Sequence, residues 1–258
     1  MTFLHVDIQE DRRALGQAAA QRASHELRQA CSLNGAATLV VATGSSQFEV
    51  LAELAAAAGI PWGVVTIFHL DEYVGIGPDH PASFRRFLHE RFIDRLPVRP
   101  AAFHEIENHR DPVTECRRLA SLMPQADFDV ALIGIGENGH LAFNDPPADF
   151  HTRDPYLLVT LDSRCRQQQV GEGWFSSLAD VPNRAISMSV ARILASRTIV
   201  CSVPDRRKAE AVQAVIEGPI TPDMPASILQ RHPRCFVYLD RESASRLQAT
   251  TATKPESP

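Results

Sequence analysis

The residues best suited to acid–base chemistry lie in the stretch 129–147, which reads DVALIGIGENGHLAFNDPP. His140 can take up or release a proton near neutral pH. Asn138 and Asp145 are close enough along this glycine-rich loop to hydrogen-bond the imidazole and fix its tautomer. A histidine that only caps a helix or satisfies a buried loop is the alternative, but the glycines and the preceding strand favour a catalytic role.

The loop around His140 follows an apolar run, residues 130–135, that is typical of a strand buried on both faces of a parallel sheet. Ligands bind at the carboxyl ends of such strands because the loops there converge on one crevice. We therefore expect other strand ends to bring further chemical groups to this loop.

A second polar turn consists of Thr43, Gly44, Ser45 and Ser46, between a predicted strand at 38–42 and a predicted helix at 47–58. Free backbone N–H groups and the positive end of the helix dipole make such a turn a natural phosphate site. Serine and threonine are also the commonest helix N-caps, so the turn alone leaves both interpretations open.

Two adjacent acids, Asp71 and Glu72, follow a predicted strand at 63–70. Neighbouring side chains on an extended segment point to opposite sides, so we expect at most one of them to face the crevice. A solvated loop is the alternative.

Lys208, in the first turn of a predicted helix at 206–217, opposes the helix dipole, and an anionic ligand would offset that cost. The alternative interpretation is that Lys208 binds no ligand and is one residue of a solvated Arg-Arg-Lys run.

Predicted strands alternate with predicted helices along the chain, which indicates an α/β fold. We expect a single domain over residues 1–245, a mostly parallel open sheet with helices on both faces (Rossmann-like), and a disordered tail at 246–258. Residues 162–174 are polar and without periodicity, so we expect an irregular lid within 150–180. The other predicted strands lie at 102–106, 156–161, 185–190, 197–203 and 235–239, and the other helices at 13–31, 84–96, 112–123 and 226–231.

The composition is that of an ordinary globular protein, with 258 residues, 44% hydrophobic and 22% charged, and a net charge of -5. We expect no nucleic-acid partner. No stretch is long enough to span a bilayer and no signal peptide is present, so we expect a cytoplasmic protein with no membrane partner.

The five cysteines form no C-x-x-C pair and are read as free thiols, although Cys165, in a polar stretch, could be accessible. The histidines have no metal-like spacing, so we assign no metal.

The segment GIGENGHLAFNDP resembles the signature of the glucosamine-6-phosphate deaminase (isomerase) family, G-x-G-x-[DN]-G-H-[IL]-[AG]-F-N-[ED]-P. The segments TGSS at 43–46 and HLDEYVG at 69–75, together with Lys208, extend the similarity over about residues 39–239. The resemblance implies that glucosamine 6-phosphate is converted to fructose 6-phosphate and ammonia, by an aldose–ketose isomerase that also acts as a hydrolase. It implies no cofactor and a possible homo-oligomer.

The resemblance also implies roles for individual residues. Asp71 would be the base that moves a proton from C2 to C1, and His140, with Asn138 and Asp145, would open the sugar ring. The residues that would bind the substrate or its phosphate are Thr43, Gly44, Ser45, Ser46, Glu72, Gly136, Gly139 and Lys208.

Two positions carry the less usual of the residues that the family pattern allows, and the lid segment departs from the family. Asn138 stands where aspartate is common, and Asp145 stands where glutamate is more usual, so Asp145 would reach His140 only if the loop closes further. The family's lid carries an arginine near the phosphate, in a segment ending R-F-F, whereas this chain has Glu172-Gly173-Trp174-Phe175. We expect activity to survive with altered pH dependence or sugar preference.

Two other functions are considered. The 6-phosphogluconolactonases share the fold, but they typically carry T-A-S-L-F-P after the histidine and D-E-R at the acids, whereas residues 141–146 here read LAFNDP and residues 71–73 read DEY. A non-catalytic sugar-phosphate sensor would bind glucosamine 6-phosphate without releasing ammonia.

Overall fold

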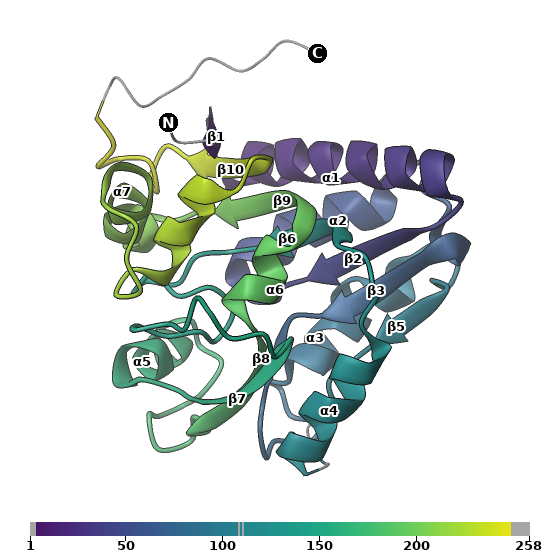
Figure 1. Ribbon diagram of the computed structural model, residues 1–258. Helices are drawn as coiled ribbons and strands as arrows, with labels where there is room; N and C mark the ends of the chain where they lie inside the picture. The colour runs from purple at the N-terminus through teal and green to yellow at the C-terminus, as the bar shows by residue number, and fades with distance from the viewer. Residues whose placement is uncertain (1–3, 108, 110, 249–258) are drawn as a thin grey trace.

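The main structural feature of the chain is a seven-stranded parallel sheet with the order β1-β10-β9-β6-β2-β3-β5 (Figure 1). The computed structural model describes residues 4–107, 109 and 111–248. The strands are β1 (Leu4–Gln9), β2 (Ala37–Val41), β3 (Val65–His69), β5 (Ala102–His104), β6 (Phe128–Ile133), β9 (Ser196–Val203) and β10 (Cys235–Asp240). The predicted α/β fold with a mostly parallel sheet is therefore confirmed.

Helices cover both faces of this sheet. They are α1 (Arg12–Asn34), α2 (Phe48–Ala56), α3 (Phe84–Arg91), α4 (Pro112–Leu122), α6 (Val190–Leu194) and α7 (Ala209–Glu217). Helices α1, α2 and α3 share one hydrophobic core with the sheet, and α4, α6 and α7 share another. Strand β2 shows why the inner strands lack alternation: Leu39 and Val41 enter the first core and Val40 enters the second.

Local sequence explains where the first helix begins and ends. The Asp11 carboxylate accepts a hydrogen bond from the backbone of Ala14 at 2.8 Å, and Gly35 takes the left-handed φ of 74° at the C-cap. Gly16 lets α1 approach α2 closely, because a Cβ there would lie 2.3 Å from the Cβ of Glu49. Helix α2 is thereby held behind the turn at residues 43–46.

A second sheet of three antiparallel strands stands beside the first, in the order β4-β8-β7 (Figure 1). Its strands are β4 (Asp71–Tyr73), β8 (Arg184–Met188) and β7 (Tyr156–Thr160). The prediction that residues 185–190 form an inner strand of the main sheet is wrong, and neither β1 nor β4 was predicted. Strand β4 has only three residues and depends on pairing with β8, which lies more than a hundred residues away in the sequence. This long-range pairing leaves no signal in the local sequence of β4.

The predicted irregular segment at 162–174 is instead mostly helical, as α5 (Ser163–Gly171). Asp162 caps this helix by accepting a hydrogen bond from the backbone of Cys165 at 2.6 Å. The buried residues of α5 include Gln168 and Gln169, so the helix has a polar inner face and shows no apolar periodicity. A helix, not an irregular loop, therefore occupies the predicted lid position.

Two further predictions concern the tail at 246–258 and the absence of a membrane-spanning stretch. The predicted tail from residue 249 onward lies outside the described residues, whereas residues 246–248 are placed, with the backbone N–H of Gln248 donating to Glu217 at 2.7 Å. Within the described ranges, no helix has both the length and the apolar character needed to cross a bilayer.

Candidate active site

The carboxyl ends of β2, β3, β6 and β9 meet at one pocket of about 550 Å³. The predicted site residues that line it are Thr43, Gly44, Ser45, Ser46, Asp71, Gly136, His140 and Lys208. Asp71 and His140, sixty-nine positions apart, therefore face the same cavity, and the small-residue turn and the lysine lie at the same cavity. Glu72, Asn138, Gly139 and Asp145 do not line it.

The turn after β2 is shaped to present backbone N–H groups to the pocket. Gly44 has φ 90° and ψ 175°, a conformation that residues with a side chain rarely adopt. A Cβ at Gly134 would lie 2.8 Å from Ser46 Oγ, so the absence of a side chain lets the turn pack against the end of β6. The buried Thr43 hydroxyl has no hydrogen-bond partner among the described residues, which leaves it available to a ligand.

Lys208 reaches the same end of the pocket from η4 (Arg206–Lys208), the short turn before α7. The side chain is buried, and burial lowers the pKa of the ammonium, although the nearby carboxylates of Glu172 and Glu137 oppose that change. Its Nζ lies 3.8 Å from Oε1 of Glu172. A buried cation close to a turn of free N–H groups is suited to hold an anion.

Strand β4 places Asp71 in the pocket. Asp71 pairs with Ser187 of β8, and strand alternation puts Asp71 and Tyr73 on one face and Glu72 on the other. The Tyr73 hydroxyl donates to Gln169 of α5 at 2.6 Å, which ties the strand to the helix across the pocket. Burial, together with the neighbouring Glu72 carboxylate, raises the pKa of Asp71 to about 8.

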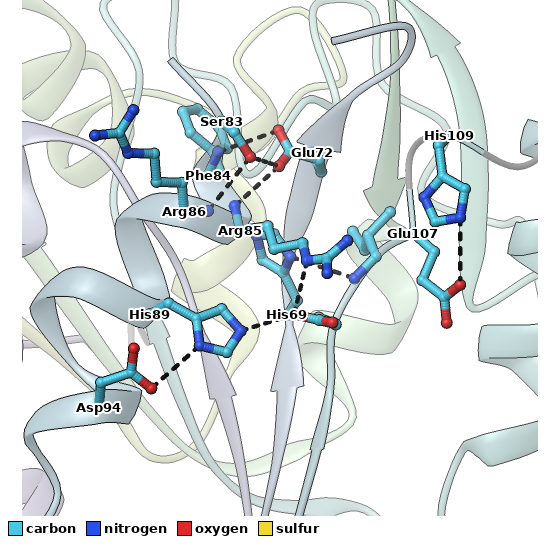
Figure 2. Close-up of polar contacts among 12 residues, drawn as sticks. His69, Glu72, Ser83, Phe84, Arg85, Arg86, His89, Asp94, Glu107 and His109 are labelled. Atoms are coloured by element: carbon cyan, nitrogen blue, oxygen red, sulfur yellow. Dashed lines mark hydrogen bonds and ion pairs between the residues drawn. The ribbon is translucent and has the colours of Figure 1, made fainter. Parts of the chain in front are cut away.

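Glu72 points away from the pocket that Asp71 lines, and its expected contact with the substrate stays a prediction. Figure 2 shows its carboxylate at the first turn of α3, where it accepts hydrogen bonds from the Ser83 hydroxyl and from the backbone N–H groups of Phe84 and Arg85, at 2.9, 3.2 and 2.9 Å. Burial raises its pKa to about 7, and these donors moderate the rise. Glu72 anchors α3 to the strand that carries Asp71.

His140 is held by its neighbours on both sides. A Cβ at Gly136 would lie 2.2–2.4 Å from the imidazole atoms, so a glycine is needed there for the ring to occupy its place. The Nδ1 atom lies 3.2 Å from Oδ1 of Asp145. The shorter acid therefore reaches the ring without further loop closure. Burial raises the pKa of Asp145, but the nearby His140 and the hydrogen bonds from Asn138 and from the backbone of Asp162 outweigh burial and bring the pKa below its ordinary value.

Asn138 does not contact the imidazole, contrary to the prediction. Its Oδ1 accepts from the backbone N–H of His140 at 3.1 Å. Its Nδ2 donates to Asp145 at 3.0 Å and to Asp162 at 2.9 Å. An aspartate at this position would add a third carboxylate to the pair, whereas the amide of Asn138 donates a hydrogen bond to each of the two acids.

Gly139 has a structural place rather than a position in the pocket. It adopts φ 82°, and a Cβ there would lie 2.0 Å from the sulfur of Met224. Its carbonyl accepts from the backbone of Ala226 at 2.8 Å. Gly139 therefore has a structural role in this loop, and its expected contact with the substrate stays a prediction.

Sequence reasoning missed the groups that α5 and the residue after it bring to the pocket, namely Gln168, Gln169 and Glu172. Glu172 was noted only as part of the segment 172–175, which stands where the family has a segment ending R-F-F. The polar spacing of these residues on a capped helix is the signal that could have revealed them.

Cys165 is buried, so the suggestion of an accessible thiol is wrong. One ligand atom each from Cys165, His140 and Asp145 lie within 4.8 Å of one another, which is metal-like geometry. Burial raises the pKa of the Cys165 thiol, however, and a metal binds the thiolate. The oxygens of Asp145 already accept hydrogen bonds from Asn138 and from the backbone of Asp162. A hydrogen-bond network accounts for this cluster.

A model of one protein family, described as glucosamine-6-phosphate isomerases/6-phosphogluconolactonase, matches residues 10–237. The chain belongs to this family. It is 39% identical over 210 residues to the glucosamine-6-phosphate deaminase of Exiguobacterium sibiricum, which covers 81% of each chain. It is 36% identical over 215 residues to glucosamine-6-phosphate deaminase 1 of Bacillus subtilis, which covers 81% of this chain and 87% of the relative.

Solved structures place this family member in the same fold. A monomeric glucosamine-6-phosphate deaminase superposes with a TM-score of 0.85 at 32% identity, over 93% of this chain and 99% of the other. The 6-phosphogluconolactonase of Shewanella baltica superposes with a TM-score of 0.73 at 21% identity, over 93% and 98% of the two chains. The second likeness shows the fold alone.

Proposed function

We propose that the protein is an amino-sugar phosphate deaminase that converts glucosamine 6-phosphate to fructose 6-phosphate and ammonia. The observation that carries this proposal is the placement of Asp71 and His140 in one pocket that the turn at 43–46 and Lys208 also line. The family and its deaminase relatives support it. Binding energy from a phosphate held away from the reacting carbons can be used to orient the sugar.

His140 would move a proton at the ring oxygen and so open the pyranose ring. Asp145 lies 3.2 Å from the imidazole and, with Gly136, would keep the ring in place. This step exposes the C1 aldehyde and leaves the C2 hydrogen acidic.

Asp71, as the carboxylate, would then take the proton from C2. The electron pair of the C–H bond forms a C1–C2 double bond, and the π electron pair of the C1 carbonyl moves to its oxygen, which takes a proton from water. The resulting enolic amine takes the C2 proton back at C1, and the nitrogen lone pair forms an iminium at C2. Water adds at C2, the nitrogen takes a proton from that water and leaves as ammonia, and the second water proton is released as a ketone forms. General acid–base steps of this kind contribute about 10²–10⁴ in rate each. The residues in the pocket supply each proton transfer, and we propose no metal or organic cofactor.

The test is to measure ammonia release and fructose 6-phosphate formation from glucosamine 6-phosphate, galactosamine 6-phosphate and their N-acetyl forms. Hydrolysis of 6-phosphogluconolactone is assayed beside them. We expect turnover of a free amino sugar phosphate. Lactone hydrolysis with no ammonia from any amino sugar would replace the proposal with a lactonase, and tight binding without either reaction would indicate a sensor.

The proposed small-molecule partner is thus a phosphorylated amino sugar. Assembly into a homo-oligomer and a cytoplasmic location stay predictions, and the deaminase structure described above is monomeric. Size-exclusion chromatography with light scattering would give the number of subunits directly.

A further inference from the structure

Glu172 places a carboxylate at the end of the pocket where the phosphate is proposed to bind. Its side chain is only 5% exposed, and it accepts hydrogen bonds from the Ser45 hydroxyl at 3.2 Å, Gln168 Nε2 at 2.7 Å and Trp174 Nε1 at 3.2 Å. Lys208 Nζ lies 3.8 Å from the same carboxylate. Two of these partners, Ser45 and Lys208, are the groups expected to hold the phosphate.

The position of Glu172 is fixed by packing as well as by hydrogen bonds. It follows α5 directly, and its backbone N–H donates to the carbonyl of Gln168 at 2.8 Å. Trp174, two residues on, packs edge-on against Phe48 and Phe87. The carboxylate is therefore a built part of the pocket, and not a surface group that happens to lie nearby.

A phosphate and this carboxylate carry charge of the same sign and need the same donors. With Glu172 ionised, the charge of Lys208 is already balanced before any ligand arrives. A phosphate dianion entering this end must either displace the carboxylate from Ser45 and Lys208 or bind beside it with the repulsion unrelieved.

We propose that Glu172 is a specificity-determining residue that occupies the anion-binding end of the pocket and weakens the binding of a phosphate dianion. This inference rests on the proposed function, because it takes this end of the pocket as the phosphate end. The cost falls on binding and not on the proton transfers, which take place at the other side of the sugar. Glu172 is thus expected to raise KM and leave kcat nearly unchanged.

The test uses the full-length protein and inorganic phosphate as the probe. Isothermal titration calorimetry gives the phosphate Kd for the natural protein, for Glu172→Gln and for Glu172→Ala. The first variant removes the charge and keeps the shape, and the second also removes the hydrogen bonds. A charge within about 4–6 Å changes an ionisation equilibrium by about 10- to 1,000-fold, so we expect both variants to bind phosphate at least about tenfold more tightly.

Glu90→Gln is the charge-matched control. Glu90 carries the same charge and pairs with Arg86 at 2.6 Å, and it does not line the pocket. Its replacement changes the net charge equally, so we expect a phosphate Kd within about twofold of the natural protein. Melting temperatures of all variants check that they are folded.

An unchanged Kd in both Glu172 variants, or an equal gain in Glu90→Gln, would overturn the inference. Phosphate binding is measured without turnover, so the outcome is separate from the proposed reaction. Tighter phosphate binding in Glu172→Gln together with no ammonia release would reject the deaminase proposal and leave the inference standing. Where turnover is present, a lower KM at constant kcat would support the inference a second time.

Discussion

Replacing Asp71 with asparagine should make the folded protein more stable at alkaline pH, although Asp71 is the proposed catalytic base. The Asp71 carboxyl is buried and lies beside Glu72, and its pKa in the folded protein rises from the ordinary 3.8 to about 8. Between these two pH values the group is protonated when folded and ionised when unfolded. Unfolding then releases a proton, so the free energy of unfolding falls as pH rises from about 4 to about 8 and levels off above.

The size of this effect follows from the two pKa values. Each pKa unit corresponds to about 1.36 kcal/mol, so the rise from 3.8 to about 8 corresponds to about 6 kcal/mol at most. Proteins have total stabilities of about 5–15 kcal/mol, and their interiors screen charges with an effective dielectric constant near 20. We therefore expect the ionisation of Asp71 to change the free energy of unfolding by about 2–3 kcal/mol, which is less than the upper bound. Asparagine has the shape of the protonated acid and carries no such dependence on pH.

The assay is urea unfolding of the natural protein and Asp71→Asn at pH 5 and pH 9. The gain in the free energy of unfolding should be larger at pH 9 by about 2 kcal/mol. Glu72 remains in both proteins, so its own pH dependence largely cancels in the comparison. A gain that is the same at the two pH values would refute the reasoning, because it would show that the buried carboxyl ionises as freely as in the unfolded chain.

Two other predictions concern catalysis. The value of kcat/KM for glucosamine 6-phosphate should rise with pH through an apparent pKa near 8, because Asp71 must lose its proton to act as a base. Initial rates measured from pH 6 to 9.5 would show this rise. A flat profile would exclude Asp71 from that step. Gly136→Ala should lower kcat by about a hundredfold, because the new Cβ would displace the His140 imidazole. The phosphate Kd should stay within about twofold of that of the natural protein. An unchanged kcat would show that the position of this ring is not critical.

The sequence was sufficient to predict the parallel sheet and the strand ends that meet at the pocket. Apolar runs followed by small or polar residues mark β2, β3 and β6, and the carboxyl ends of parallel strands necessarily lie at one edge of a sheet. The alternation rule also predicted correctly that at most one of Asp71 and Glu72 faces the pocket.

The remaining features depend on contacts between distant segments. Strand β4 exists because β8 pairs with it, and Glu72 is a helix anchor because α3 begins beside it. Asn138 lies two residues from His140, yet its amide bridges Asp145 and Asp162. Glu172 enters the pocket because α5 ends there. The pairing of β4 and the contacts of Glu72 and Asn138 leave no local pattern, since each is set by tertiary packing.

The most direct test of the central claim, that one carboxylate and one imidazole act on the same phosphorylated sugar, is ammonia release by Asp71→Asn beside the natural protein. Asparagine cannot accept the C2 proton, so we expect ammonia release to fall by at least about 10²-fold while the phosphate Kd changes by less than about twofold. Ammonia release at the natural rate by a folded Asp71→Asn protein would contradict the account.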